Sequence, residues 1–241
     1  LITANLYRIK DENTAKISLE NYYDNNNIVV IPLDQSICVS DNAKKYFKKY
    51  NKLKNALHLV SLQKQDTKNE IDYLESVVYE LESSKTLDDI NSIYMELSEH
   101  PIFKDKFLKS KSKKDSKKAT TEISSPIKMD INGYTIYIGK NNKQNDYLTL
   151  KFANNNDIWF HTKDIHGSHL ILVTNGKEIS QELINKCAGI AAFYSKAKDS
   201  SNVPVDYTLV KYVKKPSGAK PGMVIYTNYT TVNVQPISNF I

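Results

Sequence analysis

The stretch NAKKYFKKYNKLKNALHLVSLQKQDTKNEIDYLESVVYEL, residues 42–81, decides the fold of the N-terminal part of the chain. Apolar side chains recur along it at alternating intervals of four and three residues, which is the a/d spacing of a coiled coil. The seam runs through Tyr46, Tyr50, Leu53, Leu57, Val60, Lys64, Thr67, Ile71, Leu74, Val78 and Leu81. It predicts one long helix over about 41–83, capped by Ser40 or Asp41 and about 65 Å long.

The residues before this helix indicate what it pairs with. Residues 1–8 read as the last turns of an incoming helix, and residues 15–21 and 28–33 as two strands around an Asn- and Asp-rich turn. We therefore expect residues 1–100 to form an antiparallel coiled-coil arm with a β-hairpin tip at about 10–35. The alternative is a dimer that buries the seam between two chains. The first residue is Leu1 rather than methionine, and we expect a C-terminal fragment of a longer protein.

A basic segment separates the arm from a second folded part. A short helix capped by Thr86 is predicted over 86–97, and eight lysines then crowd into residues 104–118. Like charges at that density resist packing, so residues 101–126 are predicted to be a flexible linker, which either contacts phosphate or only keeps the chain soluble.

Residues 127–241 predict a compact mixed α/β domain. Strands are expected at 134–138, 157–161, 169–173, 207–213, 223–226 and 230–234, and a helix capped by Ser180 over 180–198. The whole chain is thus predicted to be α+β: a long antiparallel coiled-coil arm followed by a compact domain.

Composition limits the class of protein. The net charge is +6, but the first 100 residues carry 12 basic and 16 acidic side chains against 21 and 11 in the remainder. A polyanionic partner is therefore expected at the C-terminal part. No apolar run reaches the ~20 residues of a membrane helix, so no membrane partner is expected. The two cysteines, Cys38 and Cys187, lie far apart and indicate neither a zinc site nor a disulfide framework.

Three of the five histidines, His161, His166 and His169, lie close together beside the only tryptophan. Their spacing is not that of a helical zinc pair, so we predict hydrogen-bonded structural histidines and no metal site, with metal binding as the alternative. Ser168 and His169 are neighbours in a predicted strand and should point to opposite faces, which argues against a catalytic triad. No phosphate-binding glycine loop is present. We predict no enzyme activity and no cofactor.

Two other features indicate an RNA contact. Residues 214–222 form a loop shaped by Pro and Gly, from which Lys214, Lys215 and Lys220 are expected to project toward phosphate. Trp159 reads equally well as a base-stacking residue or as a core residue. A polar cluster near residue 141 can contact ribose or base edges, although a capped helix start also explains it.

Several blocks resemble the NFACT family, the bacterial RqcH and fibronectin-binding protein A group. They are NNKQNDYLTLKFANNNDIWFHTKDIHGSHLIL (141–172) and KYVKKPSGAKPGMVIYTN (211–228), with LITANLYRI, NYYD, IPLD and NAKKYFKKYNKLKNAL before them in the same order. His161, Ser168 and His169 match the pattern, whereas His166 stands where the family usually has proline.

The resemblance implies a ribosome quality-control factor in the cytoplasm. Such proteins bind the obstructed large ribosomal subunit carrying a peptidyl-tRNA nascent-chain complex, and recruit tRNA to add alanine tails. The alternative is an adhesin that binds fibronectin at the cell surface. Together, the resemblance and the residue pattern give these candidate RNA-binding residues: Lys140, Asn142, Lys143, Asn145, Asp146, Trp159, His161, Ser168, His169, Lys214, Lys215 and Lys220.

Overall fold

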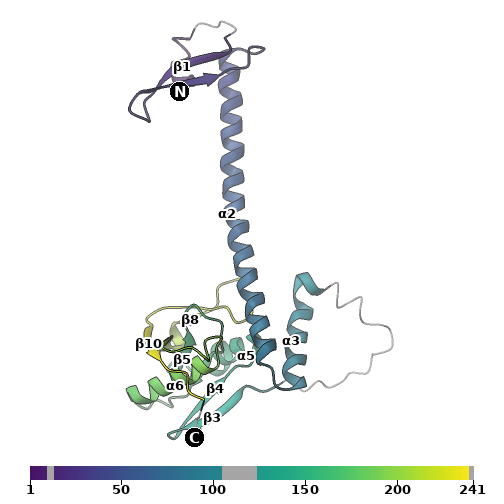
Figure 1. Cartoon of the computed structure of the whole chain (residues 1–241), viewed down its shortest axis with the longest axis vertical. Coiled ribbons are helices and arrows are strands. Elements are labelled where there is room, and N and C mark those ends of the chain that lie inside the picture. Colours follow the sequence, from purple (N-terminus) through teal and green to yellow (C-terminus); the bar gives the residue numbers. More distant parts are fainter. Residues whose placement is uncertain (10–13, 105–123, 239–241) are drawn as a thin grey trace, which may run out of the picture. The chain divides into compact units, whose positions relative to one another are not determined.

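The computed structural model describes residues 1–9, 14–104 and 124–238 and divides the chain into two compact units, residues 1–67 and 68–241. Figure 1 traces its elements along the chain. A long helix and an antiparallel sheet confirm the predicted α+β class. Most of the predicted lysine-rich linker, residues 105–123, lies outside the described residues.

The first unit contains the predicted hairpin. After α1 (Ile2–Asn5), strands β1 (Lys16–Asn21) and β2 (Asn27–Pro32) pair antiparallel. Asn25 and Asn26 in the turn have φ angles of 46° and 59°. Asparagine tolerates this left-handed region better than most residues, so the turn chemistry of the sequence accounts for the hairpin.

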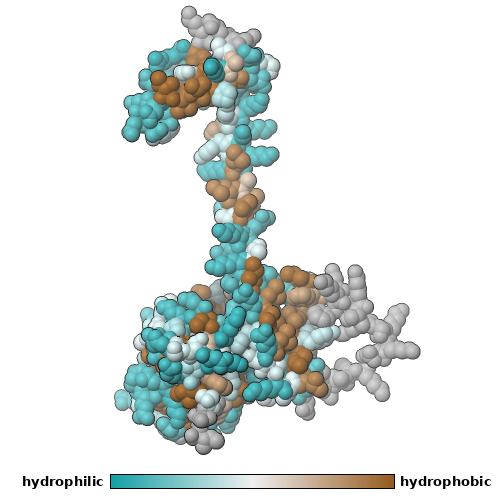
Figure 2. Space-filling view, viewed as in Figure 1, coloured by the Kyte–Doolittle hydropathy of each residue, from teal (hydrophilic) through white to brown (hydrophobic). Residues whose placement is uncertain are grey.

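Helix α2 (Val39–Ser83) begins two residues before the predicted start. The seam residues Leu53, Leu57 and Val60 are 58%, 72% and 58% exposed, and apolar side chains are visible on the surface of the α2 shaft in Figure 2. Within the described residues of the first unit, nothing covers this part of the seam. Its pairing with an antiparallel helix therefore stays a prediction.

The C-terminal end of α2 belongs to the second unit and buries a different face. Tyr73 and Val77 are buried against Ile93 of α3 (Leu87–Glu99), whereas the seam residues Ile71 and Val78 are half exposed. The Thr86 side chain caps α3 as predicted, and Asp89 completes a capping box. The heptad pattern predicts the helix, but it does not predict which face of the helix is buried in the second unit.

A six-stranded antiparallel sheet forms the centre of the second unit. The strand order is β10-β7-β5-β6-β4-β3. The strands are β3 (Ile127–Ile131), β4 (Tyr134–Ile138), β5 (Ile158–Thr162), β6 (Leu170–Leu172), β7 (Val203–Leu209) and β10 (Thr230–Val234). The strand predicted over 207–213 is wrong at its end, because residues 210–212 form the short helix η2 (Val210–Tyr212).

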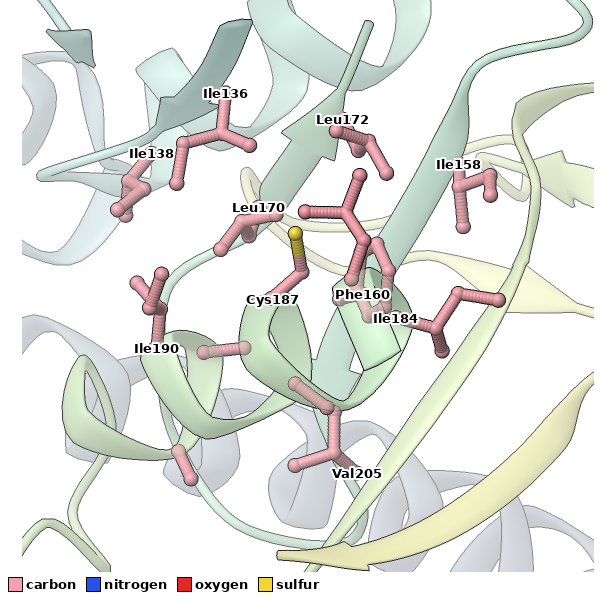
Figure 3. Packing of buried hydrophobic residues seen from close by; sticks show 14 of the residues in the cluster. Ile136, Ile138, Ile158, Phe160, Leu170, Leu172, Ile184, Cys187, Ile190 and Val205 are labelled. Carbon is pink, nitrogen blue, oxygen red and sulfur yellow. The ribbon is translucent and has the colours of Figure 1, made fainter. Parts of the chain in front are cut away.

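Helix α6 (Gln181–Phe193) covers one face of the sheet and is capped by Ser180 as predicted. Its small residues Ala188, Ala191 and Ala192 are buried, so the helix lies close to the strands. Figure 3 shows Cys187 of this helix among side chains from β4, β5 and β6, including Phe160 and Leu170. Burial raises the pKa of the Cys187 thiol to about 12.

The opposite face carries a smaller layer. It consists of α5 (Asn142–Tyr147), the π-helical turn η1 (Leu148–Phe152) and the hairpin β8 (Val213–Lys214) and β9 (Ile225–Tyr226). Trp159 packs there with Leu148 and Ile171. Because side chains alternate along a strand, Trp159 faces this layer while its neighbour Phe160 faces α6.

Candidate nucleic-acid interface

A cavity of about 650 Å³ opens on this second face, within the second unit. Strand β5 and the loop after it form one wall, the start of α5 and the loop before β9 form another, and the C-terminal part of α2 forms a third. Trp159, His161, His169 and Tyr226 contribute aromatic rings, and Asp72, Glu75 and Asp164 contribute carboxylates.

Trp159 is the centre of the aromatic group. Its ring lies nearly parallel to that of His161 at 5.7 Å, edge-on to His169 at 5.2 Å and tilted against Tyr226 at 4.8 Å. Trp159 has no exposed surface, yet it lines the cavity. Trp159 is therefore a core residue, and its indole N–H is a buried donor without a partner in the described part of the chain.

Two of the three cavity histidines, His161 and His169, are kept neutral by burial. Burial lowers the pKa of His161 to about 4 and holds the pKa of His169 well below its usual value. His169 Nδ1 lies 2.8 Å from Thr149 Oγ1, and its backbone N–H donates to Asn145 Oδ1 at 3.0 Å. These two side chains are consequently polar but uncharged, whereas the third cavity histidine, His166, lies with its Nε2 3.2 Å from a Glu75 carboxylate oxygen.

The predicted polar cluster around residue 141 mainly holds this region together. Asn145 receives the His169 bond, Asn142 Nδ2 donates to Ser76 Oγ at 3.0 Å, and Asp146 Oδ1 accepts from the backbone of Gly222 at 3.1 Å. A Cβ on Gly222 would lie 2.1 Å from Asn142 Oδ1, and its φ is +78°. Only glycine fits there, so this loop is fixed closely against α5.

The predicted phosphate-binding lysines are mostly paired within the protein. Lys140 binds Asp89 at 2.9 Å, Lys143 binds Glu99 at 2.7 Å, Lys220 binds Glu70 at 2.6 Å, and Lys215 binds Asp146. The expectation that three lysines project freely from the 214–222 loop is therefore wrong for Lys215 and Lys220. Lys214 is exposed. A phosphate contact at these positions stays a prediction, and one that would have to compete with carboxylates.

Ser168 and His169 open onto different spaces. His169 lines the aromatic cavity, whereas Ser168 lines a smaller cavity of about 240 Å³ near the end of α2. The structure thus brings together Asn142, Asn145, Trp159, His161 and His169 at one cavity and separates Ser168 and Lys143 from it. In residues 1–9, 14–104 and 124–238, no group of three His, Cys, Asp or Glu side chains is arranged to hold a metal ion.

Sequence reasoning missed part of the cavity wall. Tyr73 and Glu75 lie on α2, far in sequence from the domain of residues 127–241 (the head). The Nε2 of His166 lies 3.2 Å from a Glu75 carboxylate oxygen. Tyr226 completes the ring cluster from β9. Tyr226 lies in the block of residues 211–228 that the sequence already singles out. No feature of the sequence around Tyr73 and Glu75 predicts that they line a cavity. No helix in the described part of the chain is both long and apolar enough to cross a membrane.

Comparison with known proteins gives two family matches. Residues 1–120 match the sequence model described as NFACT N-terminal and middle domains, and residues 127–228 match the NFACT protein RNA binding domain. The chain is 43% identical over 240 residues to a Bacillus subtilis protein named Rqc2 homolog RqcH, covering 98% of this chain and 40% of that protein. A Streptococcus suis protein of the same name is 38% identical over 245 residues, covering 100% and 42%.

A solved structure is also similar. It is the C-terminal part of the fibronectin/fibrinogen-binding protein from Streptococcus suis, with a TM-score of 0.71 and 37% identity over 83% of this chain and 76% of that one. The chain spans about two fifths of the length of the curated relatives it matches.

Proposed function

Because the chain belongs to the NFACT family, we propose that it supplies the arm and the RNA-binding head of a ribosome quality-control factor. The factor binds the obstructed large ribosomal subunit, with its peptidyl-tRNA nascent-chain complex, and a further tRNA. The observation that carries this proposal is the match of residues 127–228 to an RNA-binding domain. The sheet and its polar, aromatic cavity give that domain a folded binding surface.

In this proposal the chain binds and positions RNA in the cytoplasm and carries out no chemistry of its own. Alanine tailing of the stalled chain is an activity of the whole factor, to which these 241 residues contribute contacts. Lys214, on the exposed side of the loop, is the residue assigned to a phosphate, because its neighbours Lys215 and Lys220 already have carboxylate partners.

A second function has its own support. The similar structure from Streptococcus suis is named a fibronectin/fibrinogen-binding protein, so adhesion to a host matrix protein is the alternative. The net charge of +6 favours a polyanionic nucleic acid over a matrix protein, and it makes the salt dependence of binding informative.

A binding experiment distinguishes the two functions. The affinity of the chain for purified large ribosomal subunits and for immobilised fibronectin is measured at several salt concentrations. A ribosomal ligand binds the subunits with an affinity that falls steeply as salt rises, since phosphate contacts release counterions. Lys214→Ala should lower the salt slope by about one unit, with Lys186→Ala as the control on the sheet's far side. Binding to fibronectin alone would reject the ribosomal proposal.

A further inference from the structure

The mouth of the aromatic cavity is acidic. Asp72, Glu75 and Asp164 line it, and Lys68 is the one lysine among its described lining residues. His166 lies against Glu75 at 3.2 Å. Phosphate groups are repelled by such a rim, so a cavity in an RNA-binding domain that is built this way is not a backbone site.

The interior suits a flat, uncharged ligand. His161 and Tyr226 are partly exposed rings of the cavity, and the buried rings of Trp159 and His169 lie beside them at several angles. Burial keeps the His161 and His169 imidazoles uncharged, each with one donor and one acceptor nitrogen. Flat heteroaromatic groups stack on such rings. A cavity of about 650 Å³ has the size of an ordinary small-ligand pocket and has room for a base with its ribose.

Aromatic rings beside carboxylates suit either an alkylammonium group or a base that carries amino donors. The match of residues 127–228 to an RNA-binding domain favours the base.

From these observations we propose that the cavity binds one unpaired RNA nucleobase that bears an exocyclic amino group, with its phosphates kept outside by the acidic rim. This inference rests on the proposed RNA-binding function and deepens it. The rim carboxylates accept from the amino group of adenine, cytosine or guanine, which uracil lacks. The head thus recognises the edge of a base at the cavity and contacts the RNA backbone at another surface.

Trp159 is the only tryptophan of the chain, so its emission reports ligands in this cavity directly. The 241-residue chain is titrated with adenosine, cytidine, uridine and adenosine monophosphate, with calorimetry as a second readout. We expect adenosine and cytidine to quench the emission, uridine to bind about tenfold more weakly because it lacks the amino group, and the monophosphate to bind more weakly than adenosine.

Two substitutions test the rim. The double variant Asp72→Asn and Asp164→Asn should bring the affinity for the monophosphate closer to that for adenosine, because only Glu75 is left of the three rim carboxylates. Asparagine tolerates the positive φ of 55° at position 164. Asp199→Asn changes an exposed carboxylate that does not line the cavity, and it should leave both affinities unchanged.

Three results would overturn the inference: no nucleoside binds, uridine binds as tightly as adenosine, or tetramethylammonium displaces adenosine. Failure of this inference is distinguishable from failure of the proposed function. If large subunits bind the chain but no nucleoside alters the Trp159 emission, the cavity assignment alone fails. If nucleosides bind and subunits do not, the ribosomal function alone fails.

Discussion

Trp159 combines two roles that the sequence left as alternatives. It is fully buried with Leu148 and Ile171, and it is also one of the residues that line the cavity. Position on β5 explains both, because alternate side chains of this strand face the layer that contains the cavity.

Replacing Trp159 by alanine therefore affects stability first. Trp159→Ala should lower the free energy of unfolding by about 3–5 kcal/mol, since a large core side chain is removed. Chemical denaturation followed by circular dichroism measures this. Trp159→Phe keeps most of the packing and should cost less. A loss below about 1 kcal/mol in the alanine variant would mean that the indole is not a core group.

Glu80 is a buried carboxyl with a different consequence. Burial, followed by the charge of Glu96, raises its pKa well above the usual value, although the backbone N–H of Asn142 opposes the shift. A carboxyl whose pKa is higher in the folded than in the unfolded protein stabilises the fold at pH values below its unfolded pKa. This stabilisation is lost as the pH rises through the folded-state pKa.

Glu80→Gln removes that loss, because glutamine stays neutral and its oxygen still accepts a hydrogen bond. We expect the variant to equal the parent in stability near about pH 4 and to exceed it near about pH 8. Melting temperatures at the two pH values measure the difference. Glu82→Gln, exposed on the same helix, is the control and should give no such trend. A gain that is equal at both pH values would contradict the burial argument.

At the scale of elements, the 214–222 loop has the backbone shape that the sequence predicts, but its lysines are not arranged as predicted. Its glycines do take positive φ, +77° at Gly218 and +78° at Gly222, as a Pro- and Gly-shaped loop requires. Two of its three lysines, Lys215 and Lys220, however, pair with carboxylates on α5 and α2.

Lys215→Ala should consequently lower stability by about 1–3 kcal/mol, because Asp146 is left partly buried without its cation. Lys214→Ala should leave stability unchanged within about 0.5 kcal/mol. Urea denaturation of the two variants gives the comparison. Equal stabilities would show that the Lys215 pair contributes nothing to the fold and restore the picture of a free basic loop.

Helix α2 offers a matched pair of seam positions. Leu57 is 72% exposed, whereas Leu74 is partly buried beside Tyr73, Val77 and Ile93. Leu74→Asp should cost about 2–4 kcal/mol and Leu57→Asp less than about 0.5 in this chain. Thermal unfolding measures both. If Leu57→Asp is as costly as Leu74→Asp, the seam is covered in solution, by a second copy or by another helix.

Local features were predictable from sequence because their causes are local. The caps Thr86 and Ser180 and the Asn25–Asn26 turn each depend on a few neighbouring residues. The cavity depends on side chains that only the tertiary fold brings together. Glu75 and His166 are 91 residues apart, and Lys220 and its partner Glu70 are 150 apart. No spacing rule reaches over such separations, so the pairing of the lysines was missed.

At the scale of the whole molecule, the second unit includes more than the predicted 127–241 domain. Residues 68–104 pack on it through Tyr73 and Val77 with Met223, and through the Asn142–Ser76 hydrogen bond. Tyr73 also donates a hydrogen bond to Glu96 at 2.9 Å. The C-terminal part of α2 is thus part of the head's fold.

A fragment of residues 127–241 should still form the sheet, because α6 covers its main core. It should melt at a lower temperature than residues 68–241, because removing residues 68–126 exposes the surface around Met223 and Asn142. It should also lose nucleoside binding with the α2 wall of the cavity. Calorimetry on both fragments tests this. Equal melting temperatures would mean that the α2 segment adds no stability.

The two cysteines differ in a way that matters for chemistry carried out on the intact protein. Cys187 is sealed in the sheet–helix core with a pKa near 12, whereas Cys38 is partly exposed beside the start of α2. A maleimide dye should therefore label one thiol per folded chain without any engineering. The dye would mark residues 1–67 while the lone indole marks residues 68–241. The two probes would then report separately which unit responds as the protein engages its target.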